Sequence, residues 1–156
     1  MPDPASDPLC VIALGGNVGD TADFFRRAVA SLRSGGFRVR KVSSFLRTEP
    51  EGMAPGTPAF LNGAVSGYWE GTPGKLLRLC QQIEEENGRP GNHEHYVSRT
   101  LDLDIVLFGR LRIREKHLTV PHPLAVHRAF VMTPLREIEP EMADWLERNY
   151  SVSTGM

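Results

Sequence analysis

One ten-residue segment constrains this chain more than any other, because its apolar and acidic residues alternate with the two-residue period of a β-strand. The segment runs from Arg99 to Phe108, and its pattern predicts a strand with Asp102 and Asp104 on one face. The opposite face is expected to carry Leu101, Leu103, Ile105 and Leu107. At a rise of about 3.3 Å per residue, the two carboxylates can bind one divalent cation or a pair of cations. A metal site on a rigid strand is therefore one interpretation, and two solvated acids on an outer face are the other.

The length of 156 residues favours a single domain with a substantial core. We expect a flexible N-terminal tail at 1–8, the domain at 9–145 and a C-terminal tail at 146–156. The net charge of −1 gives no strong field for nucleic acid or for an anionic membrane. The expected partners are therefore small molecules, with no nucleic acid and no membrane, and the chain is expected to act as a monomer.

The two cysteines and the N-terminal segment bear on the cellular compartment. Cys10 lies in an apolar strand pattern and Cys80 in an amphipathic helix pattern, where a thiol usually serves as a small core residue. The first eight residues lack the features of a signal peptide, and no apolar run approaches the ~18 residues of a membrane span. A cytoplasmic location is the expectation.

The hydrophobic periodicity predicts the element order β-α-β-β-α-β-β. Strands are expected at 9–14, within 37–47, at 60–69, at 99–108 and, as a shorter partner of the last, at 111–113. One helix should begin at Asp20 or Thr21 and end at Gly35, and a second should begin at Pro73 behind a Thr72 cap. A short apolar helix follows at 130–138. This order implies an α+β fold with helices packed on a mostly antiparallel sheet.

Two further patterns suggest a ligand site. Phe60 and Asn62 share a strand face directly after the loop 49–59, and a ring with an amide can stack on and read a flat heterocycle. A core phenylalanine with a structural asparagine is the alternative. Gly15 and Gly16 end a strand, but the surrounding spacing fits neither a Walker loop nor a dinucleotide fingerprint, which favours close backbone packing beside a site.

The histidines allow a different metal chemistry. His93 and His95, together with the aspartate pair, could form a zinc or manganese hydrolase site, although their spacing is loose. His122 lies between two prolines that fix its backbone, so it is placed either to touch a ligand or to serve as a structural turn residue.

Taken in order, these motifs make the chain resemble the 6-hydroxymethyl-7,8-dihydropterin pyrophosphokinase family of the folate pathway. The matching segments, between about residues 9 and 140, are Leu14–Asp20, Arg47–Pro50, Phe60–Asn62, Ile83–Arg89, Arg99–Asp104, Val120–Pro123 and Arg128–Leu135. The resemblance implies a ferredoxin-like α+β fold. It also implies transfer of pyrophosphate from ATP to the pterin hydroxymethyl group, with release of AMP.

The resemblance implies a role for each matching site residue. Asp102 and Asp104 would hold two magnesium ions, with Arg89 and Arg99 as further catalytic residues. Phe60 and Phe130 would sandwich the pterin, while Asn62 and the backbone of Thr48 would read its edge. The residues implied for the nucleotide are Gln81, Glu84, Arg99, Ile105, Thr119, His122 and Arg128.

Two loops depart from the family pattern. Glu51 replaces an apolar residue in the first loop, and Gly91, Tyr96 and Val97–Ser98 differ in the second. A binding module that has lost activity through its second loop is therefore an alternative to the active enzyme.

Overall fold

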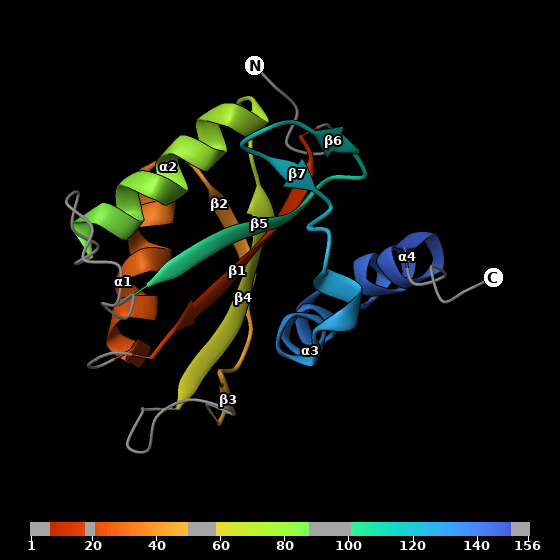
Figure 1. Ribbon diagram of the computed structural model, residues 1–156. Helices are drawn as coiled ribbons and strands as arrows, with labels where there is room; N and C mark the ends of the chain where they lie inside the picture. Colours follow the sequence, from red (N-terminus) through yellow and green to blue (C-terminus); the bar gives the residue numbers. More distant parts are fainter. Residues whose placement is uncertain (1–6, 18–20, 50–58, 88–100, 151–156) are drawn as a thin grey trace.

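A computed structural model describes residues 7–17, 21–49, 59–87 and 101–150, and it has an antiparallel sheet with helices on both faces (Figure 1). Helices α1 and α2 cover one face, and α3 and α4 lie against the other. The elements, in chain order, are β1 (Leu9–Gly16), α1 (Thr21–Ser34), β2 (Arg38–Val42), β3 (Leu46–Thr48), β4 (Phe60–Tyr68), α2 (Pro73–Glu86), β5 (Asp102–Phe108), β6 (Ile113–Arg114), β7 (Thr119–Val120), a 3-10 turn (Ala125–His127), α3 (Ala129–Ile138) and α4 (Pro140–Tyr150).

The main sheet has the strand order β2-β4-β1-β5, and β3 also pairs with β4. Each pairing among the described residues is antiparallel, which confirms the predicted α+β class. β1 is the central strand that contacts both β4 and β5, whereas β5 ends the sheet. The strand that carries both aspartates is therefore an edge strand.

The structure confirms the predicted start of α2 and the predicted end of α1. The Thr72 side chain accepts a hydrogen bond from the Lys75 amide at 3.2 Å, and Pro73 opens α2. Helix α1 ends at Ser34, two residues before Gly36, whose φ of 104° lies in the region that glycine adopts without strain.

Residues 37–47 form two strands where the sequence predicts one. Between β2 and β3, the Ser43 hydroxyl accepts a hydrogen bond from the Ala64 amide at 2.8 Å. The next residue but one, Phe45, packs edge-on against Phe25 with ring centroids 5.0 Å apart. Burial of the Phe45 ring against α1 thus interrupts the strand.

The predicted pairing of 111–113 with the preceding strand is wrong. Ile113 pairs with Val120 instead, in a separate two-stranded sheet of β6 and β7. The physical reason lies on the outer edge of β5, where the His122 amide donates to the Val106 carbonyl at 3.0 Å. Because this edge already has a partner, the segment after Gly109 pairs elsewhere.

Helix α4 continues past residue 145, where the sequence predicts the domain to end. Its residues Met142, Ala143 and Leu146 recur at helical spacing and are all buried. Burial of this apolar stripe keeps the chain in a helix as far as Tyr150, so 146–150 do not form the expected tail.

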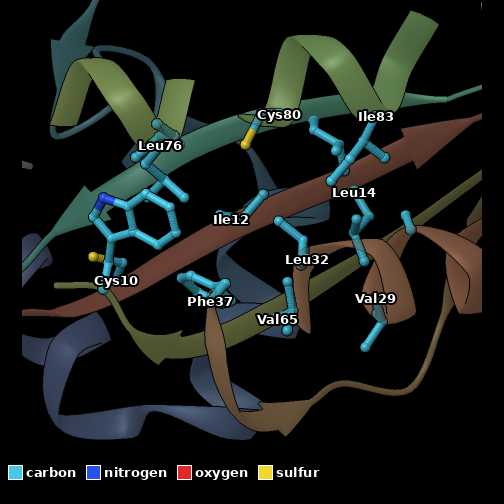
Figure 2. Packing of buried hydrophobic residues seen from close by; sticks show 14 of the residues in the cluster. Cys10, Ile12, Leu14, Val29, Leu32, Phe37, Val65, Leu76, Cys80 and Ile83 are labelled. Atoms are coloured by element: carbon cyan, nitrogen blue, oxygen red, sulfur yellow. The ribbon is translucent and has the colours of Figure 1, made fainter. Parts of the chain in front are cut away.

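Two hydrophobic clusters lie on opposite faces of the sheet. The first packs α1 and α2 against residues such as Ile12, Leu14 and Val65, and it contains both cysteines (Figure 2). Burial raises the pKa of each thiol to about 12, which fits the prediction of core cysteines without nucleophilic character. The second cluster packs α3 and α4 against the other face.

A β-bulge changes the predicted faces of β5. The β1–β5 register pairs Ile12 with Ile105 and Val11 with Leu107, so Val106 is the extra residue. Val106 and Leu107 consequently both belong to the second cluster, whereas Leu103 and Ile105 belong to the first. The prediction that Leu107 shares a face with Leu103 is therefore wrong.

In the part of the chain that the structure describes, no helix has the length and apolar character needed to span a membrane.

Candidate active site

Two cross-strand rows of the sheet form the floor of a cleft on the face that carries α3. In one row, Gly15 of β1 pairs with Asn62 of β4 on one side and with Asp102 of β5 on the other. In the next row, Ala13 pairs with Ala64 and with Asp104. Residues directly opposite each other share a face of the sheet. The small residues of the central strand therefore leave a depression with polar side chains on both flanks.

The segment before α3 and the first turn of α3 supply the facing wall. Here the cleft is lined by His122, Arg128, Phe130 and Val131. Phe130 is 38% exposed, and the Arg128 guanidinium lies 5.6 Å from the centre of its ring. An exposed ring beside a fixed positive charge suits a flat, anion-bearing ligand.

The carboxylates of Asp102 and Asp104 face the same cleft from β5. Asp102 is half-buried and Asp104 is exposed, while the residues that alternate with them are buried in the first cluster. The predicted placement of the two acids on one face of one strand is therefore confirmed.

His122 is held in the wall as a neutral ring. Its Nδ1 accepts a hydrogen bond from the Leu124 amide at 3.3 Å, so in the neutral ring the proton is on Nε2. Burial, and then the positive charge of Arg128, lower the pKa of His122, and Asp102 offsets part of this effect. At neutral pH the ring is thus uncharged and can act as a hydrogen-bond donor.

Asn62 is oriented by a neighbour on β3. Its Nδ2 donates to the Thr48 hydroxyl at 3.1 Å, and Thr48 pairs in turn with Phe60. A Cβ atom added at Gly15 would lie 3.5 Å from Asn62 Oδ1, which places that oxygen over the cleft floor. Thr48 and Asn62 thus lie in contact through their side chains. Phe60 lies beside them and outside the residues that line the cleft.

The residues predicted for the nucleotide are not all brought together. Glu84 is 5% exposed, and its Oε2 accepts the Leu103 amide hydrogen bond at 2.8 Å. The Ile105 side chain is 4% exposed within the first cluster, so only its backbone can meet a ligand. Gln81 is exposed on α2, and Thr119 is half-buried on β7. Arg89, Arg99, His93 and His95 lie outside the described residues.

Sequence reasoning missed the apolar lining of the cleft. Ala13, Val106 and Val131 contribute to it, and Gly15 forms its floor. The signal was present in β1, where side chains on the cleft face shrink from Val11 to Ala13 to Gly15. Such a gradient along one strand face marks a hollow, because the central strand has nothing to fill it.

The described residues do not support a histidine-based metal centre. Within residues 7–17, 21–49, 59–87 and 101–150, no three His, Cys, Asp or Glu side chains are grouped so that they could hold a metal ion. Asp102 and Asp104 are therefore the remaining candidate metal ligands. Two carboxylates suit a hard cation that keeps most of its water ligands.

Comparison with a solved structure supports the fold. A Plasmodium falciparum HPPK-DHPS crystal structure superposes with a TM-score of 0.61 at 13% sequence identity. The superposition covers 94% of this chain and 45% of that chain.

Curated relatives share far more sequence. The 2-amino-4-hydroxy-6-hydroxymethyldihydropteridine pyrophosphokinase of Bacillus subtilis is 44% identical over 131 residues, which are 83% of this chain and 77% of that protein. The enzyme of the same name from Synechocystis is 37% identical over 135 residues, 86% of this chain and 68% of that protein. A folate synthesis bifunctional protein of Arabidopsis thaliana is 38% identical over 128 residues, 82% of this chain and 26% of that protein.

The family model of 7,8-dihydro-6-hydroxymethylpterin-pyrophosphokinase matches residues 11–140. This range contains both rows of the cleft floor and the whole facing wall. With most of the chain covered by the model, and with relatives of this identity, the chain belongs to the 7,8-dihydro-6-hydroxymethylpterin-pyrophosphokinase family.

Proposed function

We propose that the cleft between β1, β5 and the start of α3 is the place where this ATP-dependent pyrophosphokinase joins its two substrates. The reaction moves the pyrophosphoryl group of ATP to the hydroxymethyl group of 6-hydroxymethyl-7,8-dihydropterin in folate biosynthesis. One observation carries the proposal: Asn62, Gly15 and Asp102 lie side by side on three neighbouring strands. An amide suited to a pterin edge thus stands two strand spacings, roughly 10 Å, from a carboxylate suited to a metal.

Asp102 and Asp104 are the proposed ligands of two magnesium ions. Both carboxylates face the cleft from one strand, and Gly15 and Ala13 beside them add no bulk that would exclude hydrated cations. Magnesium needs only one or two protein carboxylates when substrate phosphates and water complete its shell. When bound, it would neutralise phosphate charge and lower the pKa of the pterin hydroxyl group.

The pterin is proposed to bind over Gly15 against Phe130. Asn62 Oδ1 and Nδ2 can pair with the edge of the heterocycle, and the bond from Nδ2 to Thr48 fixes the amide plane in advance. Phe60, from the same end of β4, is proposed as the second ring of the stack. Pre-set orientation of the acceptor alcohol is the main contribution of these residues to the rate.

The phosphates are proposed to lie along the facing wall. Arg128 supplies a guanidinium beside Phe130, and the neutral His122 ring donates from Nε2. Arg89 and Arg99 are proposed to add positive charge, and Gln81, Ile105 and Thr119 to contact the nucleoside. Transfer then depends on alignment and on stabilisation of charge, since no side chain has to form a covalent bond.

Product analysis tests the function. The purified chain, incubated with ATP, magnesium and the hydroxymethyl dihydropterin, is expected to form AMP and pterin diphosphate in equal amounts. Formation of ADP would contradict the proposal. ATP binding in calorimetry without any turnover would instead favour a binding module.

Metal removal tests the proposed magnesium site. Chelation with EDTA is expected to abolish AMP formation, and added magnesium is expected to restore it, because the two carboxylates hold the cation only together with phosphate and water. Zinc or manganese that stays bound to the purified protein through dialysis would contradict the assignment and favour the histidine-based alternative.

A further inference from the structure

We propose that Glu84 is a positioning residue for the carboxylate pair, acting through the backbone of β5. The proposal rests on the roles given above to Asp102 and Asp104. It differs from a direct nucleotide contact because Glu84 is argued to act on the protein strand and not on a substrate.

Glu84 occupies a core position of helix α2. Leu76, Cys80 and Glu84 recur every four residues on one face, and the first two are completely buried. A carboxylate at the third position is costly to bury unless polar groups compensate it. Here Oε2 accepts the hydrogen bond of the Leu103 amide at 2.8 Å, in the range of a charge-assisted bond.

The bonded amide lies between the two aspartates. β5 is the edge strand of the sheet, and every second amide of an edge strand points away from its neighbour. The amide of Leu103 is one of these outward groups, and Glu84 occupies it. The bond therefore fixes the strand at the one residue that separates Asp102 from Asp104.

A second contact holds the same edge three residues later, where the His122 amide donates to the Val106 carbonyl at 3.0 Å. The two contacts lie on either side of Asp104. On the inner edge, β1 pairs with β5 from Asp102 onward. Since Asp102 is the first residue of β5, the Glu84 bond adds a contact on the outer edge, one residue from the start of the strand, where it opposes fraying.

This arrangement predicts which properties depend on Glu84. Loss of the bond lets the strand start open more often, so the two carboxylates converge less often on one cation. Binding of the pterin should not change, because Asn62 belongs to β4 and is held by Thr48.

The test compares two variants of equal size in the full chain. Glu84→Gln keeps an acceptor oxygen at the same place, whereas Glu84→Met keeps the packing volume and removes the oxygen. Glu85→Met, on the exposed neighbouring position of α2, is the matched control. Melting temperatures show that each variant is folded.

Two readouts are independent of turnover. Amide hydrogen exchange of Leu103 should be faster by about tenfold or more in Glu84→Met, and close to the unchanged protein in Glu84→Gln and Glu85→Met. Electron paramagnetic resonance with Mn²⁺, in the presence of a non-hydrolysable ATP analogue, should show weaker cation binding in Glu84→Met only. The affinity for the pterin alone should be equal in all four proteins.

Three results would overturn the inference. Unchanged Leu103 exchange in Glu84→Met would show that the bond does not hold the strand. Faster exchange with unchanged Mn²⁺ affinity would make the bond merely structural. Weaker binding of metal-free nucleotide in both Glu84→Gln and Glu84→Met, with Leu103 unaffected, would make Glu84 a nucleotide contact. Failure of the proposed function is distinguishable, since it would appear as Mn²⁺ binding that is insensitive to Asp102→Ala.

Discussion

At the scale of one residue, Gly15 leaves open volume at the centre of the sheet. It lies between Asn62 and Asp102, and its backbone does not require glycine, because its φ is outside the positive range. A Cβ atom at this position would lie no closer than 3.5 Å to its nearest neighbour, Asn62 Oδ1. A glycine here therefore keeps the volume above it empty, whereas the backbone conformation would accept other residues.

The first prediction concerns Gly15→Ala. We expect pterin affinity or kcat/KM to fall by about tenfold, equivalent to roughly 1.4 kcal/mol, because the methyl group occupies the cleft floor. The melting temperature should stay nearly unchanged. Titration calorimetry with the pterin measures the first quantity and a thermal melt the second. Full activity in Gly15→Ala would show that the ligand does not lie over β1.

The second prediction concerns the titration of His122. Burial and the charge of Arg128 both lower its pKa, so NMR titration of the ring should give a midpoint below the usual 6.5. Arg128→Gln keeps much of the packing and removes the charge, and it should raise this midpoint. A midpoint that is unchanged or lower in Arg128→Gln would contradict the electrostatic account of the wall.

The same shift has a consequence for stability. Because the folded pKa of His122 is lower than the unfolded value, the unfolded chain binds more protons between the two values. The contribution of His122 to folding stability should therefore decline as the pH falls from 6.5 through the folded pKa. Chemical denaturation at several pH values should show a smaller decline in His122→Asn.

At the scale of elements, the junction of α3 and α4 is tied to the sheet by one buried carboxylate. Glu139 Oε2 accepts hydrogen bonds from Ser66 at 2.6 Å and from Arg40 at 2.5 Å. Ser66 is fully buried on β4, and the bond to Glu139 raises the pKa of Arg40. The end of α3 is thereby fixed on the face of the sheet that carries the cleft.

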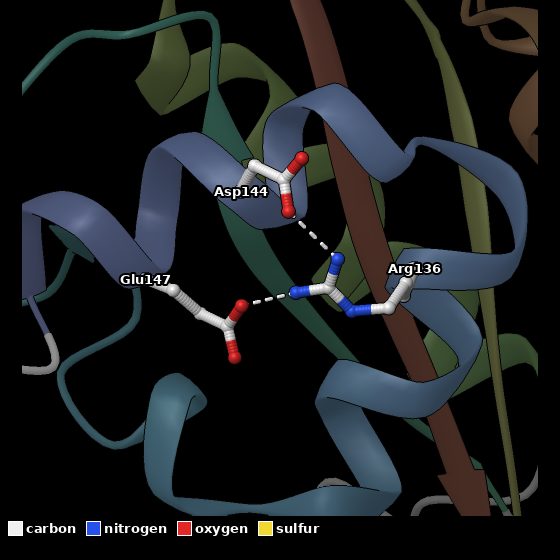
Figure 3. Close-up of polar contacts among 3 residues, drawn as sticks. All are labelled: Arg136, Asp144 and Glu147. Atoms are coloured by element: carbon white, nitrogen blue, oxygen red, sulfur yellow. Dashed lines mark hydrogen bonds and ion pairs between the residues drawn. The ribbon is translucent and has the colours of Figure 1, made fainter.

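The third prediction compares Glu139 with a surface ion-pair cluster. Glu139→Ala should destabilise the fold by roughly 1–3 kcal/mol, because it leaves the buried Ser66 hydroxyl without this acceptor. Arg136 joins α3 to Asp144 and Glu147 of α4 in exposed ion pairs, so Arg136→Ala should cost less (Figure 3). Urea denaturation measures both. A larger loss in Arg136→Ala would contradict this order.

Local signals predicted several elements, and contacts distant in sequence decided the rest. The Thr72 cap, the end of α1 before Gly36 and the alternation from Leu101 to Ile105 depend on neighbours in the chain, and the sequence reveals them. The bulge at Val106 and the pairing of β6 with β7 depend on how His122 and β1 meet β5. No local pattern specifies these contacts, so the face of Leu107 and the partner of 111–113 were predicted wrongly.

At the scale of the molecule, the sheet separates a core from a site. The face under α1 and α2 is filled with apolar side chains along its length. On the other face α3 and α4 cover the part near Val11 and Leu107, and the rows with Ala13 and Gly15 form the cleft floor. Asn62, Asp102, Asp104, His122, Arg128 and Phe130, which the resemblance to the family implies as site residues, all line this cleft. The role of each residue in binding or catalysis is what we propose above.

Two features of the cleft and its surroundings could not be predicted from the sequence. Residue types suggested a metal and an aromatic stack, but neither the hollow at Gly15 nor the burial of Glu84 can be recognised without the strand register. The sequence around a glutamate is the same whether its side chain binds a ligand or accepts a hydrogen bond from a backbone amide. Only the packing of α2 on β5 separates the two.

The fourth prediction tests the central claim, that Asp102 and Asp104 are present for chemistry and not for folding. Asp102→Asn and Asp104→Asn keep the size of each side chain and remove its charge, and Glu85→Gln is the exposed control. Each aspartate variant should lose kcat for AMP formation by at least about 100-fold. The melting temperature should change far less than the rate, since each substitution keeps the volume of the side chain and the strand is held by its buried apolar face.

The decisive measurement is therefore the rate of pterin-dependent AMP formation set beside the melting temperature for these variants. A large loss of rate with a much smaller change in melting temperature is expected in both aspartate variants, and no change in either quantity is expected in Glu85→Gln. Equal losses of rate and stability, or full activity in either aspartate variant, would contradict the central claim.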